Sequence, residues 1–332
     1  MTKLLVVGGG SIGERHLRCF QQMGASVALC ETLEARRREV ADRYKVESFA
    51  SLDDAAKRDW DAAVICTPAN LHVQHTLALA PRTKAFLIEK PLATRADEAD
   101  QLVAAMRAMP VMVAYVFRCH PAVEEMRRLV QSSALGTLHQ MTVVGGQHFP
   151  TFRPAYRNIY YSKHETGGGC IQDAATHMID LVSYVAGRFD WVFCDAAHQE
   201  LDGVEVEDTV HALGRLADGR VLFSLAENQF MAANELAIQA NCSRGSIIIK
   251  VPEHTYGIRR HGDTDWQWYG QVIHERDDLF RRQAKKFLDV CSGVADSPCT
   301  LADARHTLAV NLALLRSWRE RVVVSCRAEG RA

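Results

Sequence analysis

The chain has 332 residues and a formal net charge of -1, with 39 lysines and arginines against 40 aspartates and glutamates. A chain of this length favours two domains over one. Because the charges nearly cancel and form no long basic block, the sequence argues against a nucleic-acid-binding protein and against attraction to a membrane surface. We therefore expect a small molecule as the binding partner.

The start of the chain and its cysteines predict a cytoplasmic protein. The first residues lead into a predicted strand without the layout of a signal peptide, and no apolar stretch approaches the roughly 20 residues that a membrane helix needs. The 10 cysteines are scattered, without a C-x-x-C pair or a metal-type cluster with histidine. We expect reduced, mostly buried thiols and no bound metal.

The first predicted strand, residues 4–7, runs directly into a glycine-rich turn, and apolar residues after Gly13 recur at helical spacing. In the spacing G-x-G-x-x-G, Gly8 permits a tight turn, Gly10 lets backbone N–H groups approach a pyrophosphate, and Gly13 lets the helix lie close to the strand. Phosphates would then lie at the N-terminus of the helix. The residues predicted to contact a dinucleotide here are Gly8, Gly10, Ser11, Ile12 and Gly13.

The second predicted strand, residues 27–30, ends at Glu31. An acid about 20 residues beyond the turn is expected to bind the ribose hydroxyls. Since its carboxylate would repel a 2′-phosphate, Glu31 favours NAD over NADP. The run Arg36-Arg37-Arg38 could instead reach the 2′-phosphate of NADP. Because it is interleaved with Glu34 and Glu39, we interpret it as a solvated helix face.

Strands and helices alternate through the first third, which predicts a doubly wound parallel sheet with helices on both faces. Cofactors bind such sheets beyond the carboxyl ends of the strands. Ser51 and Thr94 are expected to cap helices. The further elements predicted are strands over 62–66, 85–88 and 111–116, and helices over 33–44, 70–80 and 96–109.

The pattern changes after Pro121 to short strands with few helices, which predicts an antiparallel sheet with helices on one face. The expected strands are 138–144, 191–198, 209–216, 220–227, 235–241, 246–251 and 322–324, and the expected helices 122–130, 170–186, 277–291 and 301–318. Since an uncovered sheet face needs a partner, we predict a homodimer or homotetramer. The predicted domains are a nucleotide-binding domain (1–119), a substrate and oligomerisation domain (120–300), and a C-terminal helix and tail (301–332) that packs back on the first domain.

Lys90 is the first candidate reacting group, because it follows an apolar strand at its carboxyl end. A partly desolvated lysine near a positively charged nicotinamide would have its charged form disfavoured, so it could polarise a carbonyl or exchange a proton. The alternative is an exposed lysine at a helix entrance. Glu89 beside it is a candidate partner for either the ribose or the lysine.

Asp173 and His177 are the second candidate pair. Positions i and i+4 share one face of a helix, so the carboxylate and imidazole project together. The alternative is a surface pair of little energetic weight. In alcohol oxidation, His177 would accept the proton and Lys90 would stabilise charge on the oxygen. Asp173 would orient the imidazole or accept a hydrogen bond from the substrate. The sequence does not decide whether His177 or Lys90 accepts the proton.

These motifs in this order resemble the glucose-fructose oxidoreductase and myo-inositol dehydrogenase family (Gfo/Idh/MocA). The glycine turn with His16, Thr67-Pro68 with His72, Glu89-Lys90-Pro91, Arg118 with Pro121, and Gly167-Gly168-Gly169 with Asp173 and His177 carry the resemblance. It implies an α/β fold with an N-terminal Rossmann domain and a C-terminal α+β domain with a large open, mostly antiparallel sheet. It also implies an NAD(P)-dependent dehydrogenase of a sugar, sugar acid or cyclitol.

The resemblance also implies roles for individual residues. Lys90, Asp173 and His177 match the catalytic trio, and Thr67, Asn70, His72 and Glu89 match positions that line the cofactor, although His16 and His72 could equally be packing residues. Ala175 and Val116 depart from the family pattern, where glycine and asparagine are frequent. The residues expected to bind substrate are Arg118, Arg157, Tyr160 and Tyr161.

Two alternative functions stay open at the level of the sequence. Relatives of this kind also cleave glycosidic bonds through transient oxidation, so an NAD-dependent glycosidase is one alternative. A non-catalytic, NAD-binding regulatory protein is the other, and the intact trio argues against it.

Overall fold

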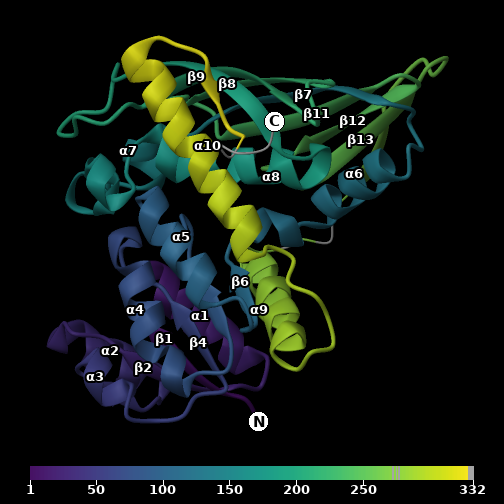
Figure 1. Cartoon of the computed structure of the whole chain (residues 1–332). Helices are drawn as coiled ribbons and strands as arrows, with labels where there is room; N and C mark the ends of the chain where they lie inside the picture. Colours follow the sequence, from purple (N-terminus) through teal and green to yellow (C-terminus); the bar gives the residue numbers. More distant parts are fainter. Residues whose placement is uncertain (271–272, 274, 276, 328–332) are drawn as a thin grey trace. The chain divides into compact units, whose positions relative to one another are not determined.

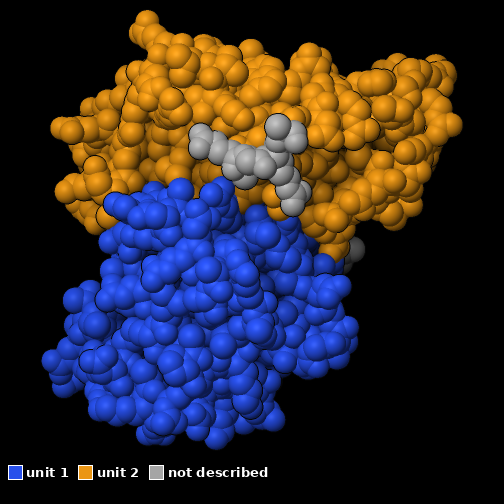
Figure 2. Space-filling view, viewed as in Figure 1, with its two compact units in different colours: residues 1–119, 274–305 blue, residues 120–273, 306–332 orange. Residues whose placement is uncertain are grey.

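The computed structural model describes residues 1–270, 273, 275 and 277–327. The chain forms two compact units, coloured separately in Figure 2. Unit 1 consists of residues 1–119 and 274–305, and unit 2 of residues 120–273 and 306–332. The chain therefore leaves unit 1, builds most of unit 2, returns to unit 1 for residues 274–305, and then enters unit 2 again.

Unit 1 is built on a six-stranded parallel sheet with the strand order β3-β2-β1-β4-β5-β6 (Figure 1). This order runs outward in both directions from the pair β1 and β4, so the carboxyl ends of these two strands flank the point where doubly wound sheets bind ligands. The predicted Rossmann fold is confirmed. Its strands are β1 (Lys3–Val7), β2 (Ser26–Cys30), β3 (Ser48–Phe49), β4 (Ala62–Ile65), β5 (Phe86–Ile88) and β6 (Val111–Val113).

The helices of unit 1 begin close to the predicted residues. They are α1 (Ser11–Gln22), α2 (Glu34–Tyr44), α3 (Leu52–Ala55), α4 (His72–Leu79), α5 (Ala96–Ala105) and α9 (Asp277–Cys291). Ser51 caps α3 as predicted, since its hydroxyl accepts a hydrogen bond from Asp54 N at 3.1 Å. The predicted cap of α5 by Thr94 is wrong. Arg95 holds that position without a side-chain cap, and Asp97 and Glu98 place negative charge in the first turn instead.

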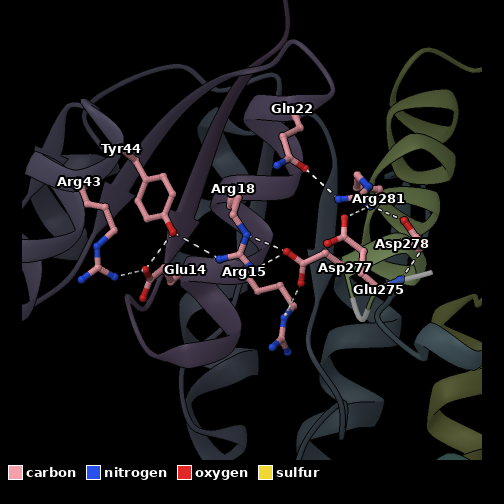
Figure 3. A network of polar contacts seen from close by, with 10 residues as sticks. All are labelled: Glu14, Arg15, Arg18, Gln22, Arg43, Tyr44, Glu275, Asp277, Asp278 and Arg281. Carbon is pink, nitrogen blue, oxygen red and sulfur yellow. Dashed lines mark hydrogen bonds and ion pairs between the residues drawn. The ribbon is translucent and has the colours of Figure 1, made fainter. Parts of the chain in front are cut away.

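Helix α9 is held against α1 by a polar network at its start, shown in Figure 3. The Asp277 carboxylate accepts hydrogen bonds from Arg15 Nε at 3.1 Å and from Arg18 Nε at 2.7 Å. Farther along α9, Phe287 meets Phe20 of α1 edge-on, with ring centroids 5.9 Å apart. A charged contact and an aromatic contact therefore fasten this late segment to the helix of the glycine turn.

Unit 2 is built on a nine-stranded sheet with the order β14-β13-β12-β11-β7-β10-β9-β8-β15. Only the central pair β7 and β10 is parallel among its described strands, so the predicted mostly antiparallel sheet is confirmed. The strands are β7 (Leu138–Gly146), β8 (Phe189–Ala197), β9 (Thr209–Leu216), β10 (Val221–Asn228), β11 (Glu235–Cys242), β12 (Gly245–Lys250), β13 (Thr255–Arg260), β14 (Gln267–Gly270) and β15 (Val324–Ser325). The sequence did not predict β13 and β14, because these two strands at the sheet edge lack a clear alternation of apolar and polar residues.

Helices α6 (Pro121–Gln131), α8 (Thr176–Ala186) and α10 (Leu301–Glu320) lie against one face of this sheet, as predicted (Figure 1). Ser317 of α10, for example, accepts a hydrogen bond from Cys194 N of β8 at 2.8 Å. The opposite face carries apolar side chains in solvent, with Val144 and Leu213 each 55% exposed and Leu222 47% exposed. This face has no covering layer within the described part of the chain.

The two units can be compared with the expected domains. The first break falls at the expected residue, between 119 and 120. Residues 274–305, expected in or next to the substrate domain, group with unit 1 because α9 packs on α1. Of the C-terminal segment expected to pack on the first domain, only residues 301–305 group with unit 1; the rest of α10 is bonded to β8, and residues 328–332 lie outside the described residues.

The cysteines agree with the expectation of mostly buried thiols. All 10 cysteines are free thiols, and all except Cys291 are buried. None of the helices in the described ranges is long and apolar enough to cross a membrane.

The contact between α9 and α1 predicts a measurable loss of stability. Asp277→Ala should lower the free energy of unfolding by about 1–3 kcal/mol, because it leaves two partly buried arginines without their carboxylate. The effect should shrink as salt is added. Urea denaturation measures it, and Glu47→Ala is the control, since the exposed pair of Glu47 and Arg58 should contribute at most about 1 kcal/mol. Equal losses for the two variants would contradict this role of Asp277.

Candidate active site

The glycine turn joins β1 to α1 with very close backbone contacts. Gly8 has φ of +97°, and a Cβ there would lie 2.8 Å from the carbonyl oxygen of Cys66. A Cβ on Gly13 would lie 1.8 Å from the carbonyl oxygen of Gly8, so only glycine allows this approach of α1. By contrast, a Cβ on Gly10, the N-cap of α1, would meet nothing within 4 Å. The turn therefore leaves open space beside the helix N-terminus, as a pyrophosphate requires.

Glu31 follows β2 and its carboxylate lies against the turn. Oε2 accepts a hydrogen bond from Gly9 N at 2.7 Å, and Oε1 accepts one from Leu33 N at 2.8 Å. Each carboxylate oxygen has a further lone pair with which to accept a bond from a ribose hydroxyl. The predicted site for the adenosine ribose therefore fits the geometry of this turn.

Arg36 is partly buried and contacts the glycine turn, whereas the sequence interpretation placed it on a solvated helix face. Its Nε donates to Gly9 O at 2.7 Å, and its guanidinium also pairs with Glu14 and Glu39. Burial lowers the pKa of Arg36, but the bonds to Glu39 and Glu14 together outweigh this and raise the pKa overall. Since two carboxylates compensate its charge, Arg36 does not overturn the preference for NAD that Glu31 indicates.

Thr67, Asn70 and His72 follow β4, and His72 is the first residue of α4. His72 is fully buried, with Nδ1 2.9 Å from Pro91 O and Nε2 2.8 Å from Thr67 O. Burial lowers the pKa of His72. His72 thus joins the loop after β4 to the loop after β5, which is a packing role, whereas Thr67 is partly exposed and Asn70 exposed.

Glu89 follows β5 and is bound from two sides. Oε1 lies 2.7 Å from Nε2 of His16, and Oε2 accepts a hydrogen bond from Lys90 N at 3.1 Å. His16 has no exposed surface and lies near the rings of Phe20 and Phe280. Nδ1 of His16 has no partner among the described residues, so we assign the donor to Nε2. The contact with Lys90 is to its backbone N–H, so it does not decide between the two roles expected for Glu89.

Asp173 of unit 2 is a buried carboxylate with strong donors. It is 2% exposed, and Arg153 Nη1 donates to Oδ2 at 2.8 Å while the Tyr160 hydroxyl donates to Oδ1 at 2.6 Å. The Asp173 carboxylate in turn raises the pKa of Arg153. An arginine and a phenol at these distances fix the orientation of the Asp173 carboxyl group.

His177 lies on the first turn of α8, four residues after Asp173 and partly exposed. The sequence predicted one α-helix over 170–186, whereas the structure has a π-helical segment, Ile171–Ala175, before α8. Such wide turns in helices are frequent at functional sites. With about four to five residues per π turn, His177 still follows Asp173 by roughly one turn. That the imidazole and the carboxylate share one side of this segment stays a prediction from their spacing.

The triple glycine before this segment makes room for a second buried carboxylate, Glu207. A Cβ on Gly169, which has φ of +89°, would lie 2.6 Å from the Glu207 oxygens. Glu207 Oε1 accepts a hydrogen bond from Ile171 N at 2.8 Å, and Oε2 pairs with His164. This carboxylate anchors the start of the π-helical segment, and the sequence offered no signal for it.

The residues expected to bind substrate have different surroundings. Tyr160 contacts Asp173, as described above. Arg118 is buried and donates to Pro298 O at 2.8 Å, and Arg157 donates to Asp202 O at 2.7 Å. Tyr161 has no exposed surface and packs in an aromatic cluster with Phe149 and Tyr156. Arg153, from the same loop as Arg157 and Tyr160, donates to Asp173.

The Rossmann sheet and its glycine turn define a nucleotide-dependent enzyme fold, and the comparison with known families identifies it. Residues 2–117 match the family described as "Oxidoreductase family, NAD-binding Rossmann fold", and residues 123–248 match "GFO/IDH/MocA C-terminal domain". The two matches cover well over half of the chain. The chain therefore belongs to the Gfo/Idh/MocA family of NAD-binding oxidoreductases, and the predicted family and cofactor are confirmed.

Individual relatives are distant in sequence. The chain is 27% identical over 196 residues to the Uncharacterized oxidoreductase YrbE of Bacillus subtilis. The matched region covers 56% of this chain and 55%, about half, of that protein. It is 23% identical over 328 residues to the Myo-inositol 2-dehydrogenase of Thermotoga maritima, covering 95% and 96% of the two chains. The solved structure of a Levoglucosan dehydrogenase in complex with NADH and levoglucosan matches with a TM-score of 0.89 at 19% identity, covering 98% of this chain and 100% of that chain. The structural likeness confirms the fold of the whole chain.

Two substitutions in the glycine turn should separate folding from NAD binding. Gly13→Ala should cost about 1–3 kcal/mol of stability, because its methyl group would overlap the carbonyl oxygen of Gly8. Gly10→Ala should change stability by less than about 1 kcal/mol, since its φ of -64° suits alanine and its Cβ meets no atom. It should nevertheless weaken NAD binding by about tenfold or more, because the methyl group occupies space next to the phosphate site.

Thermal denaturation and calorimetric titration with NAD measure the two effects. Unchanged NAD affinity in Gly10→Ala would show that the dinucleotide does not approach this turn.

Proposed function

We propose that the chain is an NAD-dependent dehydrogenase that acts on a secondary hydroxyl, or the corresponding ketone, of a sugar, sugar acid or cyclitol. The observation that carries the proposal is the buried Asp173, bound by Arg153 and Tyr160, one helical turn before His177. Membership in a family of NAD-binding oxidoreductases supports it, as do levoglucosan and myo-inositol, the compounds in the names of two similar proteins. NADP is the less favoured cofactor, because Glu31 presents a carboxylate where a 2′-phosphate would lie.

The proposed site residues divide between the units. Lys90 and the cofactor-binding residues lie in unit 1, and Asp173 and His177 lie in unit 2. When bound, NAD supplies the hydride acceptor. The glycine turn and the N-terminus of α1 would hold the pyrophosphate, Glu31 the ribose, and Thr67, Asn70 and Lys90 the part nearer the reacting ring.

The chain's own groups handle the proton of the alcohol. His177 accepts it, since an imidazole has the side-chain pKa best suited to this task near neutral pH. Lys90 stabilises negative charge that develops on the oxygen, and Asp173 orients the imidazole or a substrate hydroxyl. In a variant of this mechanism, Lys90 accepts the proton and His177 stabilises the charge on the oxygen.

His177→Ala should lower kcat by about 10²–10⁴-fold while NAD affinity stays unchanged, because it removes the proton acceptor and no part of the nucleotide site. The measurement is the absorbance of NADH formed in a screen of sugars, sugar acids and inositols with NAD and with NADP. His261→Ala, on an exposed turn of unit 2, is the matched control and should retain full activity.

Three results would contradict the proposal. Full turnover in His177→Ala would remove this residue from the mechanism. Release of free sugar without net NADH would indicate the glycosidase instead. NAD binding without turnover of any compound would indicate a regulatory protein.

We also propose that the chain forms a homodimer or homotetramer through the open face of the nine-stranded sheet, and that it is cytoplasmic. The exposed Val144, Leu213 and Leu222 on that face support the first proposal, because isolated folded chains rarely leave so many neighbouring apolar side chains in water. The free thiols support the second.

Light scattering tests the assembly. The unmodified chain should have the mass of two or four copies, and Leu213→Lys should shift it toward the monomer by placing a charge in an apolar interface. Lys57→Glu, on an exposed helix end of unit 1, is the control. A monomeric unmodified chain would refute the proposal.

A further inference from the structure

His164 lies at the centre of a series of hydrogen bonds in unit 2 that the mechanism above does not use. It belongs to the loop 160–166, just before the triple glycine, and its side chain is 23% exposed. Nδ1 lies 3.3 Å from Arg319 Nη2 of α10, and Nε2 contacts Glu207 Oε2. The ring of Trp318 meets the imidazole edge-on, with ring centroids 6.3 Å apart. The imidazole therefore joins the end of α10 to Glu207.

The two polar contacts of His164 determine which ring nitrogen carries the proton. A guanidinium has donors and no acceptor, so Nδ1 accepts the hydrogen bond from Arg319. Nε2 then carries the proton and donates it to Glu207 in a hydrogen bond. A doubly protonated ring would instead place a second N–H against the guanidinium. The hydrogen bonds therefore run in one direction, from Arg319 through His164 to Glu207.

Glu207 has no exposed surface, so each of its carboxyl oxygens needs a donor from the protein. Oε1 accepts a hydrogen bond from Ile171 N at 2.8 Å, and Oε2 accepts the one from His164. The backbone carbonyl oxygen of Glu207 accepts another from Cys170 N at 2.8 Å. Without His164, one oxygen of this buried group would lose its donor within the described residues, which is costly. The place of Glu207, and with it that of residues 170–171, therefore depends on His164.

The loop that carries His164 also carries Tyr160, whose hydroxyl donates to Asp173 at 2.6 Å. Within this loop, the Thr166 hydroxyl donates to the backbone carbonyl oxygen of Tyr160 at 2.6 Å, so the two ends of the loop are tied together around His164. A displacement of His164 is therefore passed on to Tyr160. Asp173 is thus held from two directions: its side chain is bound by Tyr160, and its segment begins at the N–H groups that Glu207 binds.

We propose that His164 is a positioning residue for Asp173 in the proposed reaction, acting through Glu207 and through Tyr160. The N–H at its Nε2 keeps Glu207 on the backbone groups that begin the π-helical segment. Its anchoring of the loop keeps Tyr160 within reach of Asp173. The inference rests on the proposed dehydrogenase function, because it assigns a role in that same reaction.

His164→Ala removes the donor to Glu207. With the compound turned over fastest in the screen above, its kcat should fall by about 10–100-fold, since a displacement of about 1 Å near the reacting groups is enough for such a loss. NAD affinity, measured by calorimetric titration, should not change, because the glycine turn and Glu31 belong to unit 1. His164→Gln should lose much less, because its amide nitrogen can donate to Glu207 in place of Nε2. His139→Ala, exposed on β7, is the matched control and should keep full activity.

A second measurement does not depend on activity. In nuclear magnetic resonance spectra of the chain labelled with ¹⁵N-histidine, the signals that are missing from His164→Gln identify His164. Near neutral pH, its Nε2 should carry the proton and its Nδ1 should be unprotonated, as the contacts with Glu207 and Arg319 require. In Arg319→Met, the preference for this tautomer should weaken, because Nδ1 loses its donor.

The outcomes separate the inference from the proposed function. A folded His164→Ala with a lower thermal midpoint but an unchanged kcat has lost only a structural contact, which overturns the inference and leaves the dehydrogenase intact. Equal losses of kcat in His164→Ala and His164→Gln overturn the role of the donor. A proton on Nδ1 of His164 in the unmodified chain overturns the inference even where His164→Ala does not fold. An unmodified chain that oxidises no polyol overturns the proposed function, while the tautomer still reports whether His164 donates to Glu207.

Discussion

A carboxylate buried in a protein requires donors that replace its lost hydration, and this constraint accounts for much of the arrangement described here. Glu89 receives His16 and the backbone N–H of Lys90. Asp173 receives Arg153 and Tyr160. Each of these carboxylates lies beside a residue that we place in the reaction. The donors therefore do more than stabilise a charge, because they also set the position of the group next to it.

In unit 1 this arrangement connects the nucleotide site to Lys90, the lysine that we propose takes part in the reaction. Helix α1 begins at the glycine turn, and one turn later its His16 contacts Glu89, which in turn holds the backbone of Lys90. The close approach of Gly13 to Gly8 fixes the height of α1 above the sheet. A shift of this helix would thus move the phosphate site and Lys90 together, and the contact of α9 with α1 resists such a shift.

Features that depend on local spacing could be predicted from the sequence, and features that depend on the path of a loop could not. The glycine turn, Glu31 and the pair Asp173 and His177 each follow from short, regular spacings. The bond from Arg153 to Asp173 depends on a loop of irregular structure, and nothing in the sequence distinguishes Arg153 from Arg157. The edge strands and the π-helical segment were missed for a similar reason, since neither has a pattern of burial that differs clearly from its alternatives.

The central claim is that Lys90, Asp173 and His177 act on one substrate hydroxyl beside the nicotinamide. A crystal structure of the chain with NAD and an accepted polyol tests it most directly. The account predicts that Lys90 Nζ and a ring nitrogen of His177 both lie within about 3 Å of the reacting hydroxyl, with Asp173 still bound to Arg153 and Tyr160. A complex in which Lys90 or His177 contacts only solvent, or in which the nicotinamide lies away from both, would contradict it.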